Sequence, residues 1–198
     1  KISVYNDGAL IKEDSLLTDN QYHKYSIDTP TTPDNLEIKL EGKVSPDFYG
    51  LTLDGTRGVQ IDNIAMRGAS GTIFTRNNNG HFSRMYRELN PKVVIMQFGG
   101  NAVPYIKDST QVRNYTKGIL RQINWIKKKK ADVKILFIGP TDLSKSINGK
   151  MSTYKLLPYL NEQLKETCIN NDVAYWNMFK AMGGKNSMPV WVKENLAG

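Results

Sequence analysis

Two glycine-containing turns hold the residues of this sequence that could do chemistry. Gly68 follows an apolar segment at residues 59–66, and the turn at residues 99–101, which ends in Asn101, follows an apolar run at residues 93–98. A backbone N–H in a glycine turn and the side-chain amide of an Asn are donors that can stabilise the oxyanion of an acyl-transfer reaction. Because the Asn amide does not titrate, it donates at any physiological pH. The spacing is equally compatible with two ordinary strand-to-helix turns.

Regular elements must place these turns side by side. The nearly continuous, β-branched run at residues 93–98 predicts a central strand that is covered on both faces. Helical spacing at residues 112–126, with Asp108 or Ser109 as N-cap, predicts a helix that packs on the sheet. A strand at 133–138, a helix from about Leu157 and a strand at 173–178 follow. Such alternation predicts a parallel sheet, whose carboxyl edge is where ligands bind.

Two further elements come before the central strand. Residues 59–66, VQIDNIAM, have the pattern of another strand that leads into the turn at Gly68. Residues 82–89 predict a short helix that ends at Asn90-Pro91. The final segment, residues 188–198, contains no recognisable element.

The N-terminal part, residues 1–57, has a different pattern. Apolar and polar residues alternate at 36–40 and at 49–53, which predicts strands with one wet face. We therefore expect a small antiparallel β-rich segment over residues 1–57 and an α/β domain over residues 58–198. Aromatic residues in the first segment, such as Tyr22 and Phe48, either stack on sugar rings or form the core of the module.

Composition argues against several other classes of function. The net charge is +8, but the lysines are spread along the chain and only Lys127–Lys130 form a run, at the end of a predicted helix. Without a recognition motif, the charge does not predict nucleic-acid binding. No apolar run approaches the roughly 20 residues of a membrane span. Cys168 is the only cysteine, and no nucleotide-binding or metal-ligand motif occurs, so we expect no disulfide, cofactor or metal.

A nucleophile and base could in principle come from this sequence. Ser70 lies in the turn after Gly68, His81 is the nearer of two histidines, and Asp62 or Asp142 could orient it. Serine is common in such turns, however, and His81 follows a polar loop that is more simply solvated. We therefore do not expect a triad of these residues.

Two segments together resemble a known superfamily. DNIAMRGASGT (residues 62–72) and VVIMQFGGN (residues 93–101) resemble the second and third conserved blocks of the SGNH hydrolases, also called GDSL-like lipases or esterases. IGPTD (residues 138–142) and AYWNMFKAMGG (residues 174–184) look like later parts of the carbohydrate-active esterases of that superfamily. The pair of blocks is far more specific than either block alone.

The resemblance implies a flavodoxin-like three-layer sandwich with a parallel sheet. It also implies that the Gly68 N–H and the Asn101 amide form an oxyanion hole, and it makes Arg67 and Gly100 candidate substrate contacts. For Arg67, a surface ion pair is the alternative. The Gly-Asp-Ser block with the nucleophile and the Asp-x-x-His block with the base are not found in this sequence. The α/β domain is therefore expected to be incomplete at both ends, with residues 1–57 as an insertion or an accessory module.

The activity implied by the resemblance is hydrolysis of acyl, mainly acetyl, esters on a carbohydrate by a serine esterase. The 198 residues alone are expected to be inactive, because the nucleophile and the base lie outside them. Relatives of this kind are exported, so the same location is implied here. The alternative is a flavodoxin-like module that binds carbohydrate without catalysis. The oligomeric state is not predicted.

Overall fold

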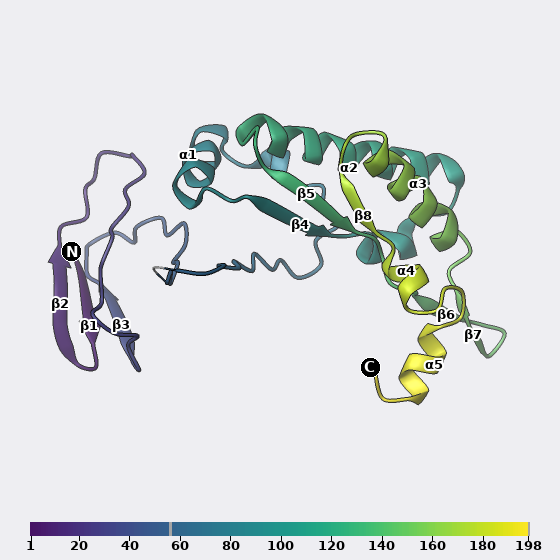
Figure 1. The fold of residues 1–198 in the computed structure, drawn as a ribbon, viewed down its shortest axis with the longest axis horizontal. Helices are drawn as coiled ribbons and strands as arrows, with labels where there is room; N and C mark the ends of the chain where they lie inside the picture. The colour runs from purple at the N-terminus through teal and green to yellow at the C-terminus, as the bar shows by residue number, and fades with distance from the viewer. Residues whose placement is uncertain (56, 198) are drawn as a thin grey trace. The chain divides into compact units, whose positions relative to one another are not determined.

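The computed structural model describes residues 1–55 and 57–197. The chain divides into two compact units, Lys1–Ile64 and Ala65–Gly198. The first holds a small antiparallel sheet, and the second holds a parallel sheet with helices (Figure 1).

The first unit is built around strand β1 (Ile2–Asn6), which lies between β2 (Ala9–Asp14) and β3 (Leu36–Leu40). Both neighbours run antiparallel to β1. Asp7 and Gly8 have φ values of 49° and 82°, and they form the tight turn between β1 and β2. Val4 of β1 is buried, whereas all of β2 is exposed. The strand predicted at residues 36–40 is thus confirmed.

The strands predicted at residues 49–53 and 59–66 are not formed. Both segments are irregular, and their apolar side chains are exposed: Leu53 is 71% accessible and Val59 is 91% accessible. In the described part of the chain neither segment pairs with another strand. An extended segment is stable only when a neighbouring strand takes up its backbone hydrogen bonds, and a β-branched sequence does not supply that partner.

The second unit contains a parallel sheet in the order β4 (Val93–Gln97), β5 (Lys134–Ile138) and β8 (Ala174–Trp176). Val94 lies opposite Ile135, and Met96 lies opposite Phe137. The three predicted strands and their parallel direction are confirmed. The central position predicted for β4 is wrong in the described residues, because only β5 pairs with it and its other edge is open.

Three helices accompany the sheet: α1 (Asn79–Leu89), α2 (Ser109–Lys129) and α3 (Leu157–Ile169). The Asn78 side chain caps α1, and the Asp108 side chain caps α2 by accepting a hydrogen bond from Gln111 N at 2.8 Å. Asn90 ends α1 in the left-handed conformation, with φ 45°. These boundaries confirm the predicted helices. Figure 1 shows the three helices on one side of the strands.

The two faces of the sheet differ in burial. On the helix side Met96, Ile135 and Phe137 are buried in a core shared with α2 and α3. On the other side Val93 is 56% accessible, Ile95 58% and Trp176 49%. The prediction that β4 is covered on both faces is therefore wrong for the described residues, and Trp176 is not a core residue.

Beyond the carboxyl ends of the strands lies a hairpin of β6 (Ser144–Ile147) and β7 (Lys150–Thr153), followed later by the short helices α4 (Met178–Ala181) and α5 (Met188–Lys193). The helix α5 corrects the expectation of no element after residue 188. Asp142, fully buried, joins these parts: its carboxylate accepts hydrogen bonds from Thr153 Oγ1 at 2.7 Å and from Met188 N at 2.8 Å.

Candidate active site

The two predicted turns come together at the carboxyl end of β4. Asn101 lies in the 3-10 helix η2 (Gly100–Tyr105), and its Nδ2 donates a hydrogen bond to the carbonyl oxygen of Ala69 at 3.0 Å. Ala69 directly follows Gly68, so the two proposed donor residues belong to loops in direct contact. An Asn amide carries two hydrogens, and this bond uses one of them. The oxyanion role of both residues stays a prediction.

Gly68 forms a tight turn. Its φ is 77°, and the turn is closed by a hydrogen bond from Ala69 N to Met66 O at 3.2 Å. The left-handed region is costly for residues with a Cβ, whereas glycine adopts it freely. Nothing lies within 4 Å of the position that a Cβ would take, so the backbone conformation and not the lack of space favours glycine here. Since residues 59–66 form no strand, Gly68 does not follow a strand as predicted.

Gly71 lets the first loop pack against the end of β4. Its φ is 81°, and a Cβ there would lie 2.5 Å from the ring of Phe98, closer than real carbon contacts allow. The Phe98 ring also packs edge-on against Phe74, which begins the 3-10 helix η1 (Phe74–Arg76), at 6.1 Å between centroids. The loop with Gly68 is thereby fixed beside the loop with Asn101.

Helix α2 holds the same loop from the other side. Tyr115 donates its hydroxyl hydrogen to the Ser70 carbonyl oxygen at 2.7 Å, and the buried Gln122 accepts a hydrogen bond from Thr75 N at 3.0 Å. Burial raises the pKa of the Tyr115 phenol well above its usual value, so it stays a donor at physiological pH. Helical spacing predicted Tyr115 as a packing residue, and nothing in the sequence indicates that its hydroxyl reaches the loop.

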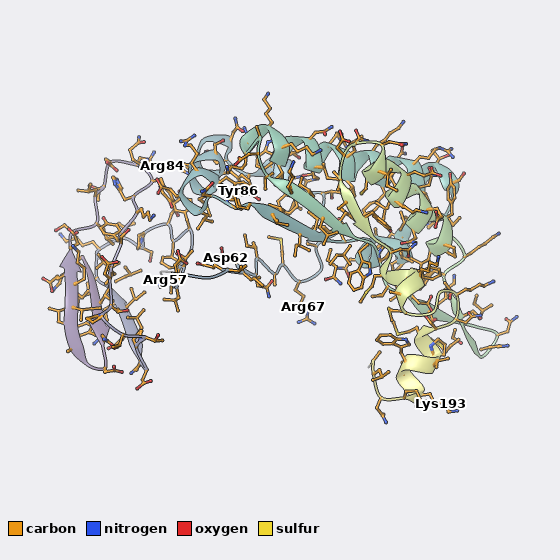
Figure 2. The ribbon with its side chains drawn as sticks, in the orientation of Figure 1. Arg57, Asp62, Arg67, Arg84, Tyr86 and Lys193 are labelled. Carbon is orange, nitrogen blue, oxygen red and sulfur yellow. The ribbon has the colours of Figure 1, made fainter. Side chains whose placement is uncertain are left out.

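The two candidate substrate contacts flank these donors. Arg67 is exposed, and Figure 2 shows its side chain pointing away from the strands and helices of its own unit. The ion pair considered for Arg67 is not seen among the described residues. Gly100 is half-buried at the start of η2. Their roles in substrate binding stay predictions.

The structure does not assemble a triad from the residues considered in the sequence. The Ser70 hydroxyl is hydrogen-bonded to Thr72 Oγ1 at 3.2 Å. Asp142 is fully buried, with both oxygens engaged by Thr153 and Met188, so it is not free to orient a histidine. Asp62 belongs to the other compact unit and accepts a hydrogen bond from Gln60 Nε2 at 3.1 Å.

The described residues contain neither a metal cluster nor a membrane-spanning helix. Over residues 1–55 and 57–197, no three His, Cys, Asp or Glu side chains are grouped so that they could hold a metal ion. In the same ranges, no helix has the length and apolar character needed to cross a bilayer.

Comparison with solved structures gives a likeness in fold. No protein-family model and no curated protein matches the sequence. Among solved structures, a peptidoglycan O-acetylesterase matches with a TM-score of 0.55 and 18% sequence identity, over 64% of this chain and 36% of that one. This chain therefore spans about a third of the length of that protein. The likeness supports the predicted α/β fold, and the structure itself confirms the parallel sheet and the small antiparallel sheet.

Proposed function

We propose that this chain is the α/β body of an SGNH-type serine esterase, which hydrolyses acyl, mainly acetyl, esters on a carbohydrate. The observation that carries the proposal is the hydrogen bond from Asn101 Nδ2 to Ala69 O at 3.0 Å. It joins the residue that matches the family's asparagine to the loop of the glycine that matches its backbone donor. The likeness in fold to a peptidoglycan O-acetylesterase supports the same activity class.

The mechanism assigns a limited part to these residues. A serine from outside the 198 residues attacks the ester carbonyl, and a histidine from outside them takes the serine proton and later passes it to the leaving alcohol. The Gly68 N–H and the second hydrogen of the Asn101 amide stabilise the tetrahedral oxyanion. Because Asn101 already donates one hydrogen to Ala69 O, its amide plane is oriented before substrate binds, which is the preorganisation that such stabilisation needs.

The open side of the sheet supports a contribution from further residues. The outer edge of β4 pairs with no strand in the described part of the chain. Val93 and Ile95, whose side chains lie on the uncovered face of the same strand, are more than half accessible. Unpaired strand edges and exposed apolar sheet faces are normally covered in native proteins. We propose that a strand carrying the nucleophile pairs with this edge.

A non-catalytic carbohydrate-binding module is the second candidate, favoured by one observation. Ser70 is bonded to Thr72 and both carboxylate oxygens of Asp142 are engaged by Thr153 and Met188, so these two residues are occupied by partners other than a substrate or a histidine. The two candidates agree on the ligand and differ on turnover.

Hydrolysis of p-nitrophenyl acetate separates the two. The 198-residue chain is compared with a longer chain that includes the coding sequence on both sides. We expect activity only in the longer chain. Activity in neither would favour the binding module, and activity in the short chain would show that the nucleophile lies within these residues, with Ser70 the first to replace by alanine.

A further inference from the structure

A second feature of the α/β unit is a cavity of ≈ 390 Å³ between η2 and the start of α3. Its apolar wall includes Val103 and Ile106 from η2 and its C-terminal end, and Leu157 and Leu160 from the first turn of α3. The volume lies within the range of small-molecule sites, which are typically mostly apolar with a few polar groups that fix the ligand.

The polar groups of this cavity are cationic. Lys107, Lys145 and Lys155 line it, and no acidic residue does. All three lysines are exposed, and none of them forms an ion pair with a carboxylate in the described ranges. Lys145 Nζ instead lies over the ring of Tyr154, 5.2 Å from its centroid. The wall thus offers three uncompensated positive charges beside an apolar surface.

Two structural features reinforce this charge. The N-terminal turn of the 13-residue helix α3 forms part of the wall, and the partial positive charge of a helix N-terminus adds to that of the lysines. The Tyr154 ring is partly buried against the core and lies under Lys145 Nζ, so it holds that ammonium group at the wall of the cavity. An anion attached to an apolar or ring-shaped body fits this wall better than a free inorganic ion.

The cavity and one of the proposed oxyanion donors share the element η2. Asn101 and Val103 belong to the same 3-10 helix, two residues apart, and that helix rises by about 2 Å per residue. The backbone of Asn101 is therefore a few ångströms along the helix axis from that of Val103, which lines the cavity. A substrate larger than a simple ester would reach from one to the other.

We infer that this cavity binds a carboxylate of an acidic glycan, held by Lys107, Lys145 and Lys155 while the ester bond lies at Asn101. The inference rests on the proposed function for the identity of the ligand as part of the substrate. The carboxylate belongs either to a sugar ring or to a peptide attached to the glycan. Both sources share the same charged group.

Calorimetric titration of the full chain distinguishes these sources without turnover. One probe is trigalacturonic acid, which carries carboxylates on sugar rings, and the other is N-acetyl-alanyl-glutamate. The fully methyl-esterified form of each is the neutral comparison. We expect one acid to bind and its ester to bind at least about tenfold more weakly. Raising the salt concentration from 0.1 M to 1 M should weaken the binding of the acid, since the screening length falls from about 10 Å to about 3 Å.

A combined Lys107→Gln, Lys145→Gln and Lys155→Gln variant tests the lysines. We expect the dissociation constant of the acid to rise about tenfold or more, because each exposed charge pair contributes a factor of up to about five. Lys128→Gln is the matched single-charge control: Lys128 is exposed at the C-terminal end of α2, about 30 Å along the helix axis from the end next to Lys107. It should change binding less than twofold. Lys155→Arg, which keeps the charge, should retain binding.

The titrations and the lysine variants together decide whether the cavity binds a carboxylate. Lysine-dependent binding of either acid supports the inference and identifies the source of the carboxylate. Equal binding of acid and ester, binding of the triple variant as tight as wild type, or binding of neither acid at millimolar concentration overturns it. Esterase activity of the longer chain without lysine-dependent binding overturns this cavity and leaves the proposed function standing. Lysine-dependent binding without esterase activity in any chain length supports the carboxylate site in this cavity and overturns the proposed esterase function.

Discussion

The two faces of the parallel sheet come from the same three strands and differ completely in environment. Ile135 faces the helices and is 4% accessible, whereas Ile95 of the neighbouring strand faces away and is 58% accessible. Both faces are apolar in sequence, which is how a strand covered on both sides is composed. One cover is supplied by the helices of this chain. The composition of the other face indicates a surface made to be buried.

The same contrast explains what the candidate site has and lacks. Tyr115 holds the loop with Gly68, and Gln122 holds the following 3-10 helix η1 through Thr75; both side chains come from α2 on the covered side. The proposed nucleophile would come from the open edge of β4. The described residues thus hold the two proposed oxyanion donors in place, and the proposed nucleophile lies outside them.

The largest expected effect compares the same substitution on the two faces. Ile135→Ala should lower the free energy of unfolding by about 2–5 kcal/mol, because it leaves a cavity in a packed core. Ile95→Ala should lower it by less than about 1 kcal/mol, because the side chain is already more than half accessible. Urea denaturation followed by circular dichroism measures both.

The comparison is sharpened in the longer chain proposed above. There Ile95→Ala should become as costly as other core truncations, since the added residues bury it. Equal and small effects of Ile95→Ala in both chain lengths would contradict the proposed cover.

The next effect is on the pH dependence of stability. Cys168 and Tyr86 lie in the core under the helices, and burial raises the pKa of each to about 12, from usual values of 9.0 and 10.0. The folded state therefore keeps these protons at a pH where the unfolded state loses them. This contribution to stability is complete below pH 9 and is lost as the pH rises towards about 12, by about 1.4 kcal/mol per pH unit for each group.

Urea denaturation at pH 8, 9.5 and 11 tests this dependence. Between pH 9 and pH 11 the free energy of unfolding should fall less steeply in Cys168→Ala than in the wild type. The difference should be the contribution of the Cys168 thiol, about 1.4 kcal/mol per pH unit. The native thiol should also react slowly with iodoacetamide at pH 8 and quickly in urea. An unchanged slope together with fast labelling of the native chain would show that Cys168 is not buried as described.

A smaller effect is expected for the contact between α2 and the site loop. Tyr115→Phe removes the hydrogen bond to the Ser70 carbonyl and should lower the free energy of unfolding by about 0.5–1.5 kcal/mol. Tyr159→Phe, at a tyrosine of α3 that is 36% accessible, is the control and should change it by less than about 0.5 kcal/mol. Hydrogen exchange at residues 68–72 should increase in Tyr115→Phe alone. If exchange there is unchanged, the hydroxyl does not hold the loop.

The elements with strong local signals could be predicted from the sequence. Asp108 as an N-cap, Asn90 before Pro91 and the helical spacing in α2 fixed the helices correctly, because these signals act within a few residues. The hairpin turns at Asp7-Gly8 and Asn148-Gly149 have the strongest short-range hairpin sequences, and using them would have found β1, β2, β6 and β7.

The predictions that were wrong concern which strands pair with one another. Residues 59–66 have the composition of a strand, but composition does not determine whether a partner strand is available. The position of β4 within the sheet could not be read from its own residues for the same reason. At the site, the nearness of the loops with Gly68 and Asn101 was predicted from their places after apolar segments. The bond to Ala69 and the hydroxyl contact of Tyr115 depend on side-chain direction, which the sequence pattern does not contain.

The most direct test of the esterase proposal is the turnover of the longer chain carrying Asn101→Ala on p-nitrophenyl acetate. We expect kcat to fall about 10²- to 10³-fold while KM changes little, because the lost donor acts on the oxyanion of the transition state. Asn124→Ala, at an exposed asparagine of α2, is the matched control and should leave kcat unchanged. Thermal unfolding of both variants separates a loss of catalysis from a loss of fold. A folded Asn101→Ala enzyme with the kcat of the wild type would contradict the account.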